Sequence, residues 1–210
     1  MQPIFITATN TDVGKTYTTL KLIELLSNRG ISVGVYKPIE TGVINHPLDA
    51  QKLLHSAQQF NQNFKDLTPK DITAYTFSLP SAPFCADTTK TINIKTLIEK
   101  YHHLSKLCDI LLIEGAGGLL VPITKELKMI DLIKKFNAKV LLVTPSRLGC
   151  INETLLSMEA LKTRNIPFEW CVNIHEDKEN FHKVTQPYYD EVFSEWWSID
   201  KGIKGYVQSL

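Results

Sequence analysis

The chain of 210 residues has a formal net charge of +1, which gives no electrostatic argument for binding nucleic acid or an anionic membrane surface. Hydrophobic residues make up 43% and charged residues 21% of the sequence, which is ordinary for a soluble globular protein and suits a single domain over residues 1–210. No apolar run is long enough to cross a membrane, and no signal peptide pattern precedes the first strand pattern. The cysteines are widely spaced without a CxxC pair, so we expect reduced thiols and a cytoplasmic protein.

A phosphate-binding motif lies near the start of the sequence. Residues 9–16 read Thr-Asn-Thr-Asp-Val-Gly-Lys-Thr, after an apolar strand pattern at 3–7 and before apolar residues with helical spacing at 17–26. This order predicts a loop whose backbone N–H groups hold phosphates, with the lysine on the β- and γ-phosphates and the last threonine on Mg²⁺. The usual first glycine is missing, since Thr9 stands six residues before the lysine. The alternative is a chance Gly-Lys-Thr at an ordinary helix start.

The next segments alternate between strand and helix patterns. A second strand is predicted at 31–36, and it ends in a loop at 37–42, the place where open α/β sheets bind ligands. A helix follows from Asp49, whose side chain can cap it. Residues 59–92 are polar and contain several prolines, which predicts mostly loop with short helical pieces. Helical periodicity returns at 94–107.

The second half of the chain continues this alternation. A Gly-rich turn is expected after the acid that ends the third strand, and the pattern weakens after about residue 178. Strands alternating with helices predict a single-domain α/β protein with a P-loop NTPase-like fold, a mostly parallel sheet with helices on both faces. The remaining predicted strands are 108–114, 138–143 and 168–173, and the remaining helices are 129–136 and 149–161.

Two acids are candidates for a magnesium site. Glu114 ends a predicted strand just before a run of glycines, although a surface loop acid is the alternative. For Asp49, the residues alone favour a plain helix cap. Lys37 lies at a strand end and is a modest candidate for holding an anionic substrate group, against the usual solvated lysine. The alternative for Thr41 is a turn-stabilising hydroxyl.

Three further features carry weaker signals. Gly149–Asn152 begins a helix after a strand, and free N–H groups there could bind a carboxylate, although a plain strand-to-helix turn is as good an explanation. His102 and His103 have no matched partner in the sequence and predict exposed surface. The pair Trp196 and Trp197 predicts packing or a subunit contact before any cofactor role.

Taken together, these motifs resemble the dethiobiotin synthetase family, in the family's order and from the N-terminus to about residue 175. Thr9–Thr16 resembles its phosphate loop, with Ala8 in place of the first glycine. The further matches are Lys37–Gly42 with its Lys-Pro-x-x-Ser/Thr-Gly segment, Asp49–Ala50 with its metal-binding segment, Glu114–Gly118 with its acidic glycine-rich loop, Leu148–Asn152 with a segment that contacts substrate across a dimer interface, and Val172–Asn173 with its base-contacting asparagine.

The resemblance implies a role for each matching position. Lys15 and Lys37 are expected to be catalytic, and Thr16, Asp49 and Glu114 to hold Mg²⁺. The expected ATP-binding residues are Asp12, Val13, Gly14, Lys15, Thr16, Tyr17, Glu114, Gly115, Ala116, Gly117 and Asn173. The expected substrate-binding residues are Thr11, Lys37, Thr41, Gly149, Cys150, Ile151 and Asn152.

The resemblance also implies a reaction of biotin synthesis, in which ATP, CO₂ and 7,8-diaminononanoate give dethiobiotin, ADP and phosphate. One substrate amine forms a carbamate, the carbamate takes the γ-phosphoryl group, and the second amine closes the ureido ring. ATP is then a co-substrate and Mg²⁺ the cofactor. The expected active unit is a homodimer with the substrate site at the interface, without nucleic acid or membrane as a partner.

Two questions stay open on the sequence. A regulatory ATPase of the MinD/ParA type is the alternative function, although such proteins carry a second, earlier lysine in the loop and none precedes Lys15 here. A non-catalytic nucleotide-binding module is a third possibility.

The family's Gly-Glu-Ile-Pro-like segment, which lines the adenine pocket, is missing after Asn173. We therefore expect a weak preference for ATP over GTP or CTP, unless the divergent tail builds a different adenine pocket.

Overall fold

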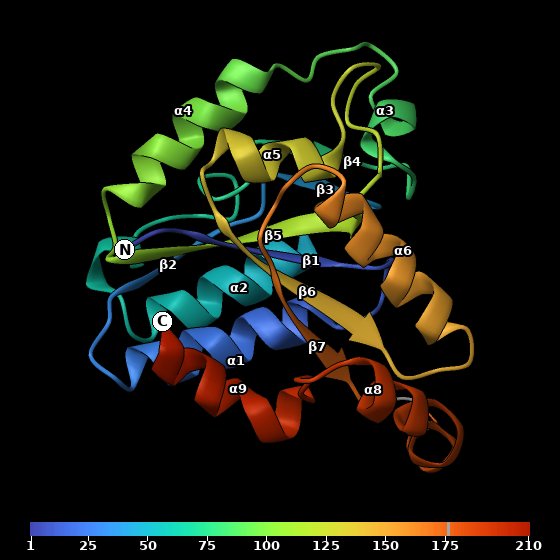
Figure 1. Cartoon of the computed structure of the whole chain (residues 1–210). Coiled ribbons are helices and arrows are strands. Elements are labelled where there is room, and N and C mark those ends of the chain that lie inside the picture. Colours follow the sequence, from blue (N-terminus) through green and yellow to red (C-terminus); the bar gives the residue numbers. More distant parts are fainter. Residues whose placement is uncertain (176) are drawn as a thin grey trace.

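A computed structural model describes residues 1–175 and 177–210 (Figure 1). Its centre is a five-stranded sheet in the order β2-β5-β1-β6-β7, and the neighbouring strands run parallel. This sheet confirms the predicted α/β fold. The strands are β1 (Ile4–Ala8), β2 (Val33–Tyr36), β5 (Ile110–Gly118), β6 (Lys139–Pro145) and β7 (Glu169–Asn173).

Helices cover the sheet on both faces, which is why its strands are buried over most of their length. The five residues of β1, the central strand, are all buried. In Figure 1, α1 (Lys15–Ser27), α2 (Leu48–Gln58) and α9 (Ile199–Ser209) lie on one side of the sheet, whereas α4 (Ile94–Ser105), α5 (Met129–Lys135) and α6 (Cys150–Lys162) lie on the other.

A second, two-stranded sheet lies beside the main one. The prediction of mostly loop over 59–92 is wrong at β4 (Tyr75–Phe77), which pairs in parallel with β3 (Ile39–Thr41). Strands of three residues are too short for periodicity to reveal. The short helical pieces expected in the same region are present as η1 (Gln62–Phe64) and α3 (Pro83–Ala86). The small sheet fixes the chain that follows β2 in an extended conformation.

Two element boundaries near the site differ from the prediction. Helix α2 begins at Leu48 with Pro47 as its N-cap, so the prediction that Asp49 caps this helix is wrong. Asp49 lies in the first turn instead, where its charge suits the helix dipole. Strand β5 continues to Gly118, so the glycines expected to form a turn are the end of a strand. A Cβ at Gly118 would lie 2.7 Å from the Thr9 carbonyl oxygen, and glycine therefore allows β5 to pass close to the phosphate loop.

The weakly patterned tail is helical and packs on the rest of the fold. Trp196 lies edge-on against Phe181 with ring centroids 5.9 Å apart, and Trp197 stacks on Tyr206 at 5.5 Å. The Val172 amide donates to the Trp197 carbonyl oxygen at 2.9 Å, which joins the tail to β7. The tail therefore confirms the packing interpretation of the two tryptophans. Its elements are α7 (Lys178–Asn180), the π-helical turn η2 (Phe181–Thr185), α8 (Gln186–Val192) and α9.

Two expectations about the surface can also be compared with the structure. His102 and His103 are exposed on α4, as predicted. Among the described residues, no helix combines the length and the apolar character that a membrane span requires.

Candidate active site

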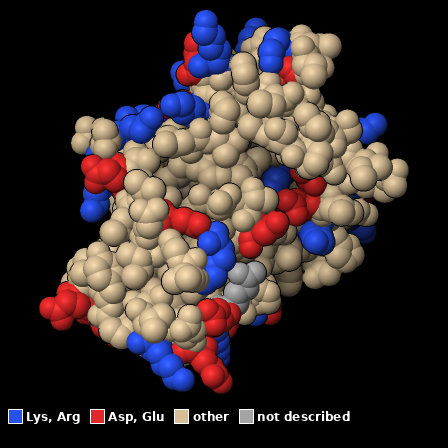
Figure 2. Space-filling view, turned by 90° about the vertical axis from the view of Figure 1, so that its right-hand side faces the viewer, with Lys and Arg blue, Asp and Glu red and all other residues tan. Residues whose placement is uncertain are grey.

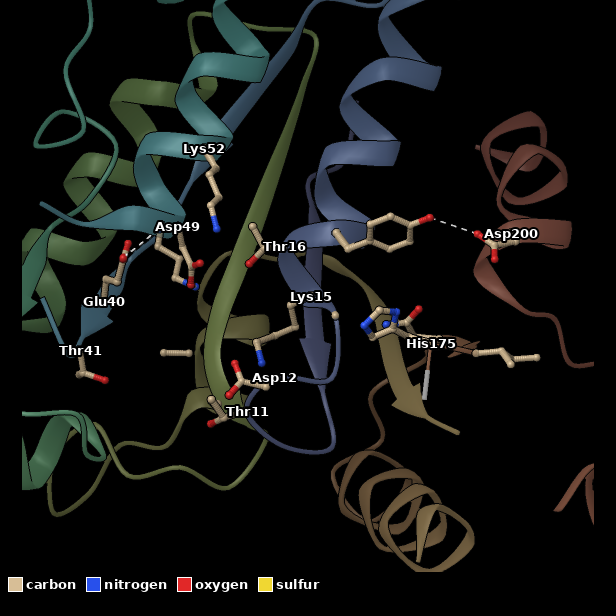
Figure 3. A pocket seen from close by; sticks show the side chains of 17 residues that line it. Thr11, Asp12, Lys15, Thr16, Glu40, Thr41, Asp49, Lys52, His175 and Asp200 are labelled. Atoms are coloured by element: carbon tan, nitrogen blue, oxygen red, sulfur yellow. Dashed lines mark hydrogen bonds and ion pairs between the residues drawn. The ribbon is translucent and has the colours of Figure 1, made fainter. Parts of the chain in front are cut away.

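A cavity of about 690 Å³ opens where the phosphate loop follows β1 and where β2, β5 and β7 end. Figure 2 shows this face hollowed, with acidic and basic side chains gathered around the hollow. Segments far apart in the sequence meet here, as the predicted sheet requires. The predicted site residues that line the cavity are Thr11, Asp12, Gly14, Lys15, Thr16, Tyr17, Lys37, Thr41, Asp49, Ala116, Gly117 and Asn173 (Figure 3).

The phosphate loop is held in a fixed shape between β1 and α1. Gly14 is the N-cap of α1 and has a left-handed backbone with φ of 107°. A Cβ at Gly14 would lie 2.2 Å from Nδ2 of Asn173, so only glycine fits there. The same amide nitrogen donates to the Val13 carbonyl oxygen at 3.0 Å, which ties the end of β7 to the loop. The start of α1 has no side-chain cap, and backbone N–H groups at such a helix start are suited to an anion.

The Lys15 ammonium lies inside this loop. Its Nζ donates to the Asn10 carbonyl oxygen at 2.9 Å, and only 7% of the residue is exposed. Burial, reinforced by the positive charge of Lys37, lowers the pKa of Lys15 to about 8. A bound phosphate would favour the charged form again, so this lysine is suited to an anionic ligand.

A mostly buried ionic cluster borders the cavity, which Lys37 and Asp49 line. Lys37 Nζ lies 3.0 Å from Asp49 Oδ2 and 2.7 Å from Glu114 Oε1. Glu114 is fully buried and also accepts hydrogen bonds from the hydroxyl groups of Thr16 and Thr19, both at 2.9 Å. Glu114, the loop threonine Thr16 and Lys37 after β2 are thus brought together as the sequence predicted, although Glu114 lies within β5 and not at its end.

Electrostatic contacts in this cluster favour the charged forms of Lys37 and Asp49. Burial alone would lower the pKa of Lys37, but the carboxylates of Glu114 and Asp49 outweigh burial and raise the pKa above its ordinary value. Burial would likewise raise the pKa of Asp49, and the Lys37 ammonium holds it below its ordinary value. Lys37 and Asp49 therefore keep their charges at neutral pH.

The donor atoms of this cluster fit a magnesium ion. Mg²⁺ prefers hard oxygen ligands and is commonly held by one or two carboxylates together with nucleotide phosphates and water. Glu114 and Asp49 already converge on one cation, the Lys37 ammonium, and the Thr16 hydroxyl reaches the same Glu114 oxygen. Within residues 1–175 and 177–210, no group of three or more His, Cys, Asp or Glu gathers as a metal site. The two acids and the hydroxyl therefore suit an ion that arrives with a nucleotide.

Comparison with known proteins gives the family. A family model described as an AAA domain matches residues 2–188. The ATP-dependent dethiobiotin synthetase BioD of Sulfurovum sp. (strain NBC37-1) is 61% identical over 210 residues, with 100% of both chains covered. This chain belongs to the dethiobiotin synthetase family. Proteins of the same name from Wolinella succinogenes and Helicobacter pylori (strain ATCC 700392 / 26695) are 38% and 37% identical, covering 100% and 89% of this chain and 98% and 88% of their own.

Solved structures share the fold of this dethiobiotin synthetase family member at greater distance. A ParA family ATPase from Chlorobium tepidum TLS has a TM-score of 0.56 at 12% identity and covers 100% of this chain and 90% of its own. The cell division protein MinD of Aquifex aeolicus has a TM-score of 0.52 at 15% identity, covering 99% and 86%. These neighbours confirm the P-loop NTPase-like fold. Identities this low show the fold alone and do not favour a regulatory ATPase.

The segment that resembles the family's substrate contact lies outside the cavity. Gly149–Asn152 forms the start of α6, and none of its residues belongs to the cavity lining as described. Cys150 is buried, and its Sγ lies 3.9 Å from Thr185 Oγ1, so its side chain faces the interior. Asn152 and Gly149 are exposed. Contact between this segment and a substrate in the cavity of the same copy is therefore not supported.

Three predicted ATP-binding residues lie behind the cavity wall. Val13 is buried and contributes its carbonyl oxygen to the bond with Asn173. Glu114 is fully buried and contacts the cavity-lining residues Thr16 and Lys37. Gly115 faces the core, since a Cβ there would lie 3.0 Å from the Phe5 ring.

The cavity also contains residues that the sequence analysis missed. Lys52 extends from α2 toward the cavity in Figure 3, and Asp200 of α9 accepts a hydrogen bond from the Tyr17 hydroxyl at 3.1 Å. Helical spacing from Asp49 could have found Lys52, which lies one turn later. The place of Asp200 in the cavity wall depends on how α9 packs against α1, and no local sequence pattern predicts this packing. The missed residues are Glu40, Lys52, Ile174, His175 and Asp200.

Proposed function

We propose that this protein converts 7,8-diaminononanoate, CO₂ and ATP to dethiobiotin, ADP and phosphate, the ureido-ring step of biotin synthesis. One observation carries the proposal: Lys15 of the phosphate loop and Lys37 of the segment after β2 line the same cavity, together with Thr41. A phosphoryl donor and an anionic acceptor can lie side by side in such a cavity. The name of the relative that is 61% identical supports this assignment.

The proposed chemistry needs positioning and charge neutralisation more than a protein nucleophile. One substrate amine adds to CO₂ and loses a proton, which gives a carbamate. A carbamate oxygen attacks the γ-phosphorus, and ADP leaves. The second amine then attacks the carbonyl carbon of the mixed anhydride, and phosphate leaves as the ring closes.

We assign the two catalytic roles to Lys15 and Lys37. Burial lowers the pKa of Lys15 to about 8 in the free protein. In its charged form, Lys15 would neutralise charge on the transferring phosphoryl group. Lys37 has three N–H donors, and Asp49 and Glu114 take two of them within the described part of the chain. The third can hold the carbamate. Thr11 and Thr41, which also line the cavity, are proposed to contact the substrate.

We propose that Thr16, Asp49 and Glu114 hold the Mg²⁺ that accompanies ATP. The bound ion would offset the negative charge of the phosphates. Two contacts support this role. The carboxylates of Asp49 and Glu114 both contact the Lys37 ammonium, and the Thr16 hydroxyl donates to the Glu114 oxygen that Lys37 contacts.

At the nucleoside end, Asn173 and Tyr17 are proposed to contact ATP. The Asn173 side-chain nitrogen is engaged by the Val13 carbonyl oxygen, which leaves its side-chain oxygen as an acceptor for an amino group of the base. Tyr17 presents a ring in the cavity wall, next to Asp200.

We propose a homodimer in which Gly149–Asn152 of one copy completes the substrate site of the other. Exposed apolar side chains lie just before α6 and in the middle of this helix, and exposed apolar patches mark protein interfaces. The Thr9 hydroxyl donates to Glu153 Oε2 at 3.2 Å, so this segment is also joined to the phosphate loop of its own copy. The exposed apolar residues here are Leu148 (81%), Leu155 (37%) and Leu156 (63%).

The proposed function predicts that phosphate release depends on diaminononanoate. With Mg²⁺, ATP and bicarbonate present, we expect release to begin only when the diamine is added. A regulatory ATPase or a nucleotide-binding module would show a rate that the diamine does not change.

We place the enzyme in the cytoplasm, since its four cysteines are free thiols, which suit a reducing compartment.

A further inference from the structure

Glu40 lies in the cavity wall without a role in the proposed reaction. It belongs to β3, and 7% of the residue is exposed. Its Oε1 accepts a hydrogen bond from the Asp49 backbone N–H at 2.9 Å, and its Oε2 accepts one from the Ala50 backbone N–H at 2.9 Å. Figure 3 shows its side chain turned toward the start of α2. Both oxygens of the carboxylate are thus committed to one helix end.

These two bonds replace a helix cap that α2 lacks. Its N-cap is Pro47, which makes no side-chain cap hydrogen bond, and the first N–H groups of a helix have no partner within the helix. The Glu40 carboxylate, from a different segment, satisfies two of them and complements the helix dipole. The position of the first turn, which contains Asp49, is therefore set from β3.

We infer that Glu40 is a positioning residue for Asp49, an inference that rests on the proposed magnesium role of Asp49. Glu40 holds the Asp49 backbone, and Lys37 holds the Asp49 carboxylate at 3.0 Å. The backbone contact keeps the carboxylate directed toward Glu114 and Thr16 when a metal ion competes with the Lys37 ammonium. Residues that orient a metal ligand raise metal affinity although they never touch the ion.

Asp87 offers a matched control for this role. Its buried carboxylate accepts hydrogen bonds from the backbone N–H groups of Thr91 at 2.9 Å and Ile92 at 2.8 Å, again two successive residues. Asp87 does not belong to the cavity lining as described. Glu40→Gln and Asp87→Asn therefore each disturb a carboxylate that accepts two backbone N–H hydrogen bonds. Only the exchange at Glu40 disturbs a contact to Asp49.

The test measures Mn²⁺ binding to the full chain in the presence of ADP, by the electron paramagnetic resonance signal of free Mn²⁺. We expect Glu40→Gln to weaken Mn²⁺ affinity by about tenfold, the size typical of changes behind a metal ligand. The affinity for ADP without metal should stay unchanged, because the phosphate loop is intact. Asp87→Asn should bind Mn²⁺ as the wild type does, even where its melting temperature is lower.

Wild-type Mn²⁺ affinity in Glu40→Gln, with only a lower melting temperature, would overturn the inference and leave Glu40 as a helix cap. If Glu40→Gln does not fold, Glu40→Asp replaces it, because this variant keeps the charge on a shorter side chain. Weaker Mn²⁺ binding by Glu40→Asp would then support the inference, and unchanged Mn²⁺ binding would overturn it. The measurement uses no turnover. A protein that behaves as expected here but forms no dethiobiotin would contradict the proposed function and not the positioning role.

Discussion

Lys37 and Glu114 form a buried ion pair, with Nζ 2.7 Å from Oε1 and side-chain exposures of 3% and 0%. Removing Lys37 would leave the buried Glu114 charge without its cation, and removing Glu114 would leave Lys37 with only the partly exposed Asp49 as its partner. Breaking a buried pair in this way costs more than the pair itself contributes. The charges proposed to serve the reaction are therefore also part of what stabilises the fold.

Glu114→Gln should destabilise the protein, because an amide cannot accept all the hydrogen bonds that Lys37, Thr16 and Thr19 donate to the carboxylate. We expect a loss of about 3 kcal/mol, or a melting temperature lower by roughly 6 to 12 °C. Glu153→Gln is the control, since its pair with Arg147 is partly exposed and should contribute less than about 1 kcal/mol. Equal melting temperatures for the two variants would refute the structural role of the Glu114 charge.

Lys15→Ala should reduce kcat by about a hundredfold or more, because it removes the main side-chain charge on the transferring phosphoryl group. Lys21→Ala, on the same helix and outside the cavity lining, is the control and should retain activity. Activity of Lys15→Ala within about tenfold of wild type, only ~1.4 kcal/mol, would rule out the catalytic role.

Nucleotide binding should take up a proton near pH 8. Burial and Lys37 lower the pKa of Lys15 to about 8 in the free protein, so part of the population is neutral at that pH. Phosphate raises this pKa again, so ADP binding draws a proton onto Lys15, and the affinity for ADP falls as pH rises through 8. Calorimetry in buffers of different ionisation enthalpy measures the uptake. Lys15→Arg, which stays charged, should show none, and equal uptake in both proteins would contradict the assignment.

The fold could be predicted from the sequence to the extent that its elements are long and periodic. The strands and helices of the central sheet follow from apolar runs and helical spacing, and the phosphate loop from its place between β1 and α1. The pairing of β3 with β4 could not be predicted, because each has only three residues and the two are far apart in the chain.

The candidate site divides in the same way. Lys15 and Lys37 follow β1 and β2, and Glu114 lies within β5 of the same parallel sheet, so their meeting near one edge is a consequence of topology. Glu40 and Asp200 enter the cavity through contacts with α2 and with Tyr17, and side-chain contacts between distant elements leave no local pattern. The residues alone favour Asp49 as the cap of α2 and only the family resemblance predicts a metal role, because no local pattern shows that the Glu40 carboxylate caps this helix.

A charged residue in the exposed apolar patch of α6 should yield a monomer with low activity. We expect Leu156→Asp to prevent assembly, because Leu156 is 63% exposed beside the segment proposed to complete the partner's site. Phe60→Asp, at an exposed position just after α2, is the control and should stay dimeric. Sedimentation at the assay concentration gives the oligomeric state, and a fully active monomer would refute the shared site.

GTP and CTP should support measurable turnover. The family's segment for the adenine pocket is missing after Asn173, so most binding should come from phosphate contacts that all nucleoside triphosphates share. Competition assays that compare kcat/KM for ATP, GTP and CTP measure this. A preference for ATP above roughly a thousandfold needs about 4 kcal/mol of base-specific contacts, and would mean that the tail, with Asp200 and His175 in the cavity wall, reads adenine.

The most direct measurement follows the carbon of CO₂ into the product. Purified protein is incubated with Mg²⁺, ATP, diaminononanoate and ¹³C-bicarbonate, and the products are separated and identified by mass spectrometry. The proposed function predicts dethiobiotin that carries the label in its ureido carbon, formed in equal amount with ADP and absent when ATP is omitted. ATP hydrolysis without labelled dethiobiotin, at a rate that diaminononanoate does not change, would contradict it.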